Sequence, residues 1–220
     1  MHDLSTLFAV IQGFTELART QTDADGQLAQ DLQSVLDATR RARSLAGTLS
    51  HDTGDADAAH VRCDLGPLVH ETIEMLHPVL PANVEVRVEL AVEEPIVQGD
   101  PLQIRRALLN VVTNAVHAMP PEGGIVDVEI RAVRDYHPSG PVDTISIVVD
   151  DDGCGMDAET LRRVCDCLYT TRREQGGTGL GMWTVKRVMA AHRGFVHVQS
   201  VPRGGTTVRL GFPRLEERRG

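Results

Sequence analysis

The chain has 220 residues, of which 41% are hydrophobic, enough for one ordinary domain and a smaller one. Lys and Arg total 22 against 31 Asp and Glu, and the net charge of -9 disfavours nucleic acid or an anionic membrane as a partner. No apolar run approaches the roughly 18 residues of a membrane span, and no signal peptide opens the sequence, so we expect a cytoplasmic protein without membrane contact.

The first fifty residues have the pattern of a helical hairpin. Residues 4–18 place apolar side chains at three- and four-residue spacing, and at 100° per residue His2 and Thr6 fall on the opposite, solvent-facing side. Residues 28–49 repeat the same spacing after a turn. A hairpin of this size buries too little surface to stand alone, so we predict that residues 1–52 form a homodimeric four-helix bundle. The alternative is a hairpin that packs on its own globular domain.

A second domain is expected after a linker. Residues 53–59 are small, polar and acidic, which is typical of a linker, and residues 60–214 then form the domain, with 215–220 as a solvated tail. Residues 65–76 have the pattern of a helix that stops before a proline. Residues 84–90 alternate as a half-buried strand.

A longer helix follows, capped by Asp100 and ending at Pro120. Asn110 and Asn114 lie one turn apart on it, with His117 three residues further along. Amide oxygens suit Mg²⁺ and an imidazole can contact a phosphate, although two asparagines in such a helix can also be satisfied structural groups. The predicted buried residues are mainly Leu102, Ile104, Leu108, Leu109, Val112 and Val116.

A hairpin and a short helix are expected next. Residues 126–133 and 144–149 read as two strands, with residues 135–141 as the loop between them. Asp157 is expected to cap a helix over residues 158–167.

The second strand runs into VVDDDGCGM, residues 148–156, where three acids precede two glycines. Gly153 and Gly155 can adopt backbone angles closed to other residues, so a ligand can approach the main chain beside a carboxylate. With Ala158 they formally match the dinucleotide fingerprint GxGxxA. We reject that reading, because three acids would crowd a pyrophosphate and no second parallel strand follows the next helix.

The segment TTRREQGGTGLGMW, residues 170–183, is a polar, glycine-rich loop that leads into a helix. Its backbone N–H groups and the helix N-terminus can gather around a phosphate, although a plain flexible linker has a similar composition. No GxxxxGK[ST] is present, which excludes a P-loop. Two strands, 195–201 and 206–212, close the domain. The candidate phosphate contacts are Thr170, Thr171, Arg172, Gly177, Thr178, Gly179 and Gly181.

The four cysteines form no CxxC pair and no regular framework, so we expect free thiols. A zinc site that uses Cys165 and Cys167 with a histidine is the alternative, although one intervening residue is unusual ligand spacing.

Taken together, these motifs resemble the catalytic region of a bacterial sensor histidine kinase, over almost the whole chain. NVVTNAVHAM is similar to the N box of that family, VVDDDGCGM to its first glycine box, and GGTGLGMWTVKRVMAAHRG to its second. MHDLSTLFAVIQGFTELA is similar to its phosphoacceptor box. The resemblance implies an α+β protein: a dimeric four-helix bundle followed by an α/β sandwich ATP-binding domain of the gyrase and histidine-kinase type.

The resemblance also implies roles in binding the donor, ATP. Asp151 would accept a hydrogen bond from the adenine amino group, in a pocket shaped by Gly153 and Gly155. Asn110 and Asn114 would hold Mg²⁺ and the triphosphate, and His117 would contact a phosphate. The second glycine box, with Gly177, Gly179, Leu180 and Gly181, would cradle phosphates.

On the acceptor side, the resemblance makes His2 the phosphoacceptor, Asp3 the acid that takes its proton, and Thr6 the residue associated with dephosphorylating a partner. The implied function is ATP-dependent histidine autophosphorylation and transfer to a response-regulator receiver domain. Two alternatives stay open. Cys165 and Leu168 replace the usual phenylalanines before the ATP lid, which favours a phosphotransfer or scaffold protein with an inactive or regulatory ATP domain. An ATPase or serine kinase of the same superfamily is the other.

Overall fold

The computed structural model describes residue 28 and residues 60–137, 140–172 and 178–215. The predicted hairpin of residues 1–52, with His2, Asp3 and Thr6, and the predicted linker therefore lie outside the described residues, apart from Leu28, which is helical and exposed. Contacts divide the chain into two compact units, residues 1–58 with 172–178 and residues 59–171 with 179–220. The second unit contains all the strands that the structure describes.

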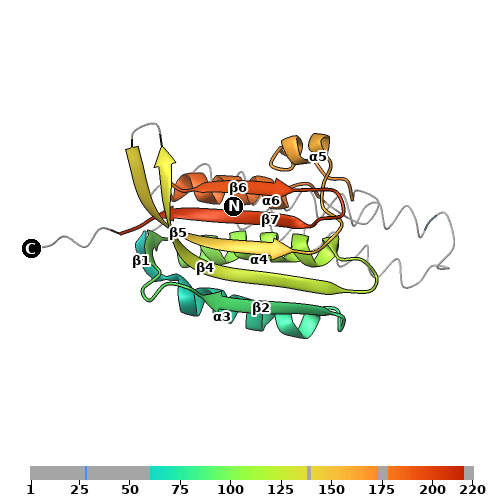
Figure 1. Cartoon of the computed structure of the whole chain (residues 1–220), viewed down its shortest axis with the longest axis horizontal. Coiled ribbons are helices and arrows are strands. Elements are labelled where there is room, and N and C mark those ends of the chain that lie inside the picture. Colours follow the sequence, from blue (N-terminus) through green and yellow to red (C-terminus); the bar gives the residue numbers. More distant parts are fainter. Residues whose placement is uncertain (1–27, 29–59, 138–139, 173–177, 216–220) are drawn as a thin grey trace, which may run out of the picture. The chain divides into compact units, whose positions relative to one another are not determined.

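A five-stranded sheet forms the centre of this unit (Figure 1). Its strand order is β2-β4-β5-β7-β6, in which β2 pairs parallel with β4 and the other neighbours pair antiparallel. A second, two-stranded antiparallel sheet pairs β1 with β3, and an isolated bridge joins Val97 of β3 to Arg214 just after β7. The strands are β1 (Val61–Asp64), β2 (Val84–Leu90), β3 (Ile96–Gly99), β4 (Gly124–His137), β5 (Gly140–Asp151), β6 (Phe195–Ser200) and β7 (Thr206–Pro213).

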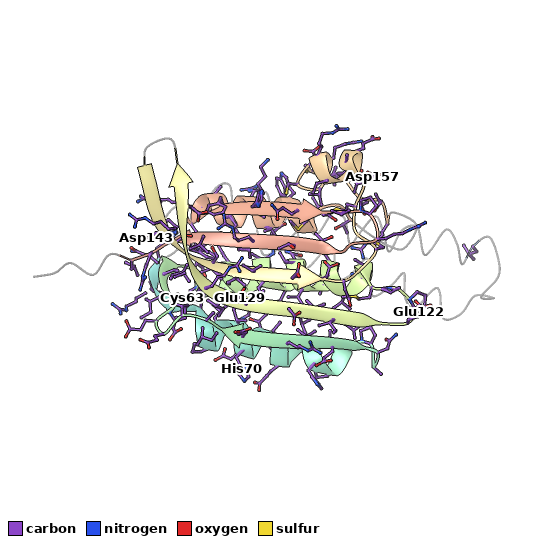
Figure 2. All side chains as sticks on the ribbon, in the orientation of Figure 1. Cys63, His70, Glu122, Glu129, Asp143 and Asp157 are labelled. Atoms are coloured by element: carbon purple, nitrogen blue, oxygen red, sulfur yellow. The ribbon has the colours of Figure 1, made fainter. Side chains whose placement is uncertain are left out.

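One face of the sheet is covered by helices α3, α4 and α6, and the hydrophobic core lies between these helices and the sheet (Figure 1). The opposite face carries charged side chains, among them Glu129, which alternates with the buried residues of β4 (Figure 2). The described helices are α3 (Leu65–Leu76), the short 3₁₀ helix η1 (His77–Val79), α4 (Pro101–Ala118), α5 (Ala158–Arg163) and α6 (Gly181–Ala191). The unit is thus an α/β sandwich, as predicted.

Helices α3 and α4 both begin at a side-chain cap, and the cap of α4 is the predicted Asp100. The carboxylate of Asp64 accepts from the backbone N–H of Gly66, and that of Asp100 accepts from Leu102 and Gln103. One predicted core residue of α4 is wrong, because Leu102 is 74% exposed. It lies in the first turn, outside the stripe that packs on the sheet. That stripe consists of Ile104, Ala107, Leu108, Val111, Val112 and Ala115.

The predicted loop over residues 135–141 is also wrong, since β4 runs to His137 and β5 starts at Gly140. Asp135 explains the longer hairpin. Its carboxylate accepts hydrogen bonds from Arg209, at 2.7 Å, and from the hydroxyl of Thr144, at 2.7 Å. These bonds hold the end of β4 against β5 and β7.

Two further elements differ from the expectation. Helix α5 ends at Arg163 instead of residue 167, because it buries no side chain and the chain leaves it before Val164 and Cys165 pack against the core. In β2 the half-buried pattern stops early. Val88 and Leu90 are 38% and 52% exposed, since β2 is an edge strand of the sheet.

Strand β5 pairs antiparallel with both of its neighbours, β4 and β7. This excludes a dinucleotide-binding fold at the GxGxxA match, because that fold needs parallel neighbours. Among the described helices, none is long and apolar enough to cross a bilayer.

Candidate nucleotide site

The three consecutive acids at the end of β5 point in different directions. Asp151 follows the buried, helix-facing residues of β5 at every second position and is 8% exposed. Asp150 lies on the uncovered face, where its carboxylate accepts a hydrogen bond from the hydroxyl of Thr207. Asp152 belongs to the turn, and its carboxylate accepts from the backbone N–H of Ile125 at 2.9 Å. Only Asp151 therefore presents a carboxylate to the interior.

The Asp151 carboxyl group has a raised pKa. Burial raises its pKa from the ordinary 3.8 to about 6, although hydrogen bonds from the backbone N–H groups of Gly153 and Thr206 oppose the rise. The negative charges of Asp150 and Asp152 push the pKa in the same direction as burial. At neutral pH this side chain is a buried, ionised hydrogen-bond acceptor.

The two glycines after Asp151 are required by close contacts. Gly153 donates to Oδ1 of Asp151 at 3.0 Å, and a Cβ at Gly153 would lie 2.7 Å from the carbonyl oxygen of Ala118. Gly155 has a φ of 63°, and a Cβ there would lie 2.0 Å from the carbonyl oxygen of Val201. The turn is thereby wedged between the end of α4 and the β6–β7 turn.

Helix α4 brings its two asparagines to the first residue of α6. A Cβ placed at Gly181 would lie 3.6 Å from Oδ1 of Asn110 and 3.6 Å from Nδ2 of Asn114. The missing side chain leaves space directly between these amides and the N-terminus of α6, whose backbone N–H groups favour anions. The described residues thus place two carboxamides beside a helix N-terminus, an arrangement that can accommodate an anionic group.

Gly179 lies directly against the backbone of Leu168. It has a φ of 69°, and a Cβ there would lie 2.4 Å from the backbone carbon of Leu168. Leu168 itself has a φ of 62° and is 43% exposed. Where the resemblance predicts an aromatic side chain, the chain therefore presents a solvent-exposed leucine.

The other predicted residues are placed less specifically. His117 is exposed on the last turn of α4, three residues beyond Asn114, and Leu180 is buried immediately before α6. Thr170 is half-buried and Thr171 is exposed, after the turn that follows α5. Gly177 lies outside the described residues, and Arg172 and Thr178 belong to the other compact unit.

The sequence reasoning missed the contribution of the β6–β7 turn. Thr206, the first residue of β7, pairs with Asp151 in the sheet. Ser200 lies next to it, and its hydroxyl binds both this turn and the turn after Asp151. A hydroxyl residue immediately before the Val-Pro-Arg-Gly-Gly turn was the available signal.

All four cysteines are free thiols, as predicted. Burial raises the pKa of the Cys165 thiol, which disfavours the thiolate that zinc needs. Within residues 60–215, as far as they are described, no group of His, Cys, Asp and Glu side chains could hold a metal ion. The described structure gives the zinc alternative no support.

The domain is an α/β sandwich in which a buried carboxylate beside a glycine turn, amides on a facing helix and a glycine at a helix start form a candidate nucleotide site. Comparison with known proteins places the domain in a family. Residues 99–216, more than half of the chain, match the family described as histidine kinase-, DNA gyrase B-, and HSP90-like ATPase. The chain belongs to this family and contains its histidine-kinase type of ATP-binding domain.

Relatives extend the similarity to nearly the whole chain. Sporulation kinase A of Bacillus subtilis (strain 168) is 26% identical over 97% of this chain and 33% of its own length. A putative sensor protein of Shewanella frigidimarina (strain NCIMB 400) is 35% identical over 56% of this chain and 18% of its own length. The structure of the mycobacterial sensor histidine kinase MprB has a TM-score of 0.59 and 24% identity, covering 70% of this chain and 97% of that one. The chain thus spans at most a third of these two sequence relatives.

Proposed function

We propose that the protein is an ATP-dependent protein-histidine autokinase that phosphorylates His2 and passes the phosphoryl group to an aspartate of a response-regulator receiver domain. One observation carries the proposal: the buried carboxylate of Asp151 accepts from the glycine turn at 3.0 Å and faces the helical layer. An ionised acceptor in this position suits the amino group of adenine and rejects the carbonyl group that guanine has in its place.

The phosphates would lie between Asn110, Asn114 and the start of α6, where the missing Cβ of Gly181 leaves room. Mg²⁺, when bound, would be held by the two carboxamides and would neutralise part of the triphosphate charge. His117 would add a contact to a phosphate from the end of α4. The N-terminus of α6 would stabilise the negative charge on the phosphates.

His2 supplies the nucleophile in this proposal. The imidazole nitrogen forms a bond to the γ-phosphorus while the bond between that phosphorus and the leaving oxygen of ADP breaks. Asp3 takes the proton that the imidazole loses. Transfer to the receiver aspartate then regenerates His2, and Thr6 is proposed to assist dephosphorylation of the receiver. The homodimer predicted from residues 1–52 would present His2 to the nucleotide domain.

Labelling the full chain with γ-labelled ATP and Mg²⁺ tests the proposal. We expect an acid-labile, base-stable phosphoryl group on the chain that is absent from His2→Gln, because a phosphoramidate has this stability. Robust labelling of His2→Gln would refute the assignment of the acceptor.

One observation favours the second candidate, a phosphotransfer or scaffold protein with an inactive or regulatory ATP domain. Leu168, which stands where the resemblance predicts a phenylalanine before the ATP lid, is 43% exposed. It therefore does not anchor this segment in the core. ATP binding without self-labelling, together with uptake of phosphate from a phosphorylated receiver, would support this candidate over the kinase.

A further inference from the structure

The β6–β7 turn and the glycine turn after β5 are locked together at the end of the sheet where β5 and β6 end and β7 begins (Figure 1). The backbone N–H of Arg203 donates to the carbonyl oxygen of Cys154 at 2.8 Å. A Cβ at Gly205, which has a φ of 78°, would lie 1.8 Å from the carbonyl oxygen of Asp151. No side chain fits between the two turns, so each fixes the position of the other.

The hydroxyl of Ser200, the last residue of β6, lies at this junction. It accepts a hydrogen bond from the backbone N–H of Met156 at 2.8 Å and donates to the carbonyl oxygen of Gly205 at 2.9 Å. The hydroxyl oxygen of Thr206 lies 2.9 Å away. Because Ser200 has a single hydroxyl proton, which Gly205 receives, Thr206 must be the donor in the last bond. All three bonding positions of the Ser200 hydroxyl are therefore used.

These bonds bear directly on Asp151. Its carboxylate receives the backbone N–H of Gly153 at 3.0 Å, from the turn that also contains Met156. Met156 and Gly205, the two backbone partners of Ser200, belong one to each turn. A shift of the glycine turn against the β6–β7 turn would carry the Gly153 N–H away from the carboxylate.

We propose that Ser200 is a positioning residue of the adenine pocket: its hydroxyl fixes the turn after Asp151 against the β6–β7 turn, so that Gly153 keeps its hydrogen bond to the carboxylate of Asp151. The inference rests on the proposed role of Asp151 in binding adenine. Ser200 acts through Asp151, so its removal weakens nucleotide binding and changes the pH at which binding is lost. A residue that only stabilised the turn would change neither.

Titration of the full chain with ADP and Mg²⁺ between pH 5.5 and 8, followed by calorimetry, tests the proposal. We expect Ser200→Ala to bind ADP about tenfold more weakly at pH 7.5, the order of magnitude for losing a buried hydrogen bond. Its binding should also fall away at a higher pH than in the wild type, because loss of an N–H donor raises the pKa of the carboxyl group further. Ser200→Thr, which keeps the hydroxyl, should stay within about twofold of the wild type.

Thr207→Val is the matched control, because it removes a hydroxyl bonded to Asp150 on the uncovered face of the same sheet. It should leave both the affinity and its pH profile unchanged. A lower melting temperature of Ser200→Ala with unchanged affinity and pH profile would overturn the positioning role, and so would an equal loss in Ser200→Thr. Asp151→Asn separates the two claims: if it binds ADP like the wild type, the proposed adenine role fails as well.

Discussion

The backbone N–H of Asp100 donates a 2.9 Å hydrogen bond to Nε2 of His192, and Nδ1 of the same ring lies 2.7 Å from the carbonyl oxygen of Val188. Since Nε2 accepts, Nδ1 must carry the proton and the ring is neutral. The buried imidazole thus joins the start of α4 to the end of α6. Further along α4, Asn110 and Asn114 lie beside Gly181, the first residue of α6. The bonds of His192 thus link the two helices to which the proposed function assigns the phosphates.

This arrangement makes the stability of the domain depend on pH. Burial lowers the pKa of His192 from its ordinary 6.5, and the ring of His60, 5.0 Å away, lowers it further, while the carbonyl of Val188 and the charge of Asp100 oppose the change. The unfolded chain therefore binds a proton at this residue at a higher pH than the folded chain. His192 stabilises the fold fully above pH 6.5, and this stabilisation is lost as the pH falls below that value.

We predict that His192→Phe lowers the free energy of unfolding by about 2 kcal/mol at pH 7.5, because two hydrogen bonds are lost. Between pH 7.5 and 5.5 the stability of the wild type should fall more steeply than that of the variant. Urea unfolding followed by the fluorescence of Trp183, the single tryptophan, measures both quantities. Parallel pH dependences in the two proteins would contradict the role of the neutral ring.

Asp151 also titrates near neutral pH, but its contribution to stability changes with pH in the opposite direction to that of His192. Its pKa of about 6 lies above the ordinary 3.8, so the folded chain binds this proton more tightly than the unfolded chain. The contribution of Asp151 to stability therefore decreases as the pH rises from about 4 to about 6. The ionised carboxylate is a stronger acceptor for the amino group of adenine than the protonated carboxyl group, in which one oxygen has become a donor.

We predict that the affinity for ADP is constant above pH 7 and falls as the pH drops through 6, approaching about tenfold per pH unit. Calorimetric titrations in a series of buffers give the profile. An affinity that stays level down to pH 5 would show that Asp151 is not the acceptor.

Gly179 and Gly181 should respond differently to alanine. At Gly181 the new methyl group would lie 3.6 Å from each asparagine amide, an ordinary contact that the fold tolerates. It would occupy the space assigned to a phosphate, so we expect about tenfold weaker ADP binding, or roughly 1.4 kcal/mol, with an unchanged melting temperature.

Gly179→Ala is the companion variant, because its φ is 69° and its Cβ would lie 2.4 Å from the backbone of Leu168. Here we expect a lower melting temperature, by several degrees, since about 1 kcal/mol or more of backbone strain is introduced. If Gly181→Ala binds ADP normally, the phosphates do not lie between α4 and α6.

The elements with strong local patterns were predictable from the sequence. Helix α4 begins at Pro101 after the Asp100 cap and ends before Pro120, as expected, because capping and proline effects act within a few residues. The resemblance singles out Asp151 among the three acids, and the structure shows that alternation along β5 buries this one, while its role toward adenine stays a prediction.

Other features depend on contacts distant in sequence. Strands β1 and β3 are four residues each, too short for either to have a recognisable period of its own, and they pair with each other across more than 30 residues of sequence. The length of the β4–β5 hairpin depends on the ion pair between Asp135 and Arg209, which are 74 residues apart. Ser200 acts on a turn 44 residues away, through a bond to Met156. No local pattern encodes such pairings.

The central claim is that Asp151, and neither of its acidic neighbours, recognises adenine, and one calorimetric comparison tests it most directly. ADP with Mg²⁺ is titrated at pH 7.5 into the wild type, Asp151→Asn and Asp150→Asn. We predict that Asp151→Asn binds at least about 100-fold more weakly, the range for a charged, buried hydrogen-bond partner. Asp150→Asn, altered on the uncovered face, should bind within about twofold of the wild type. Equal affinities for Asp151→Asn and the wild type would contradict the account.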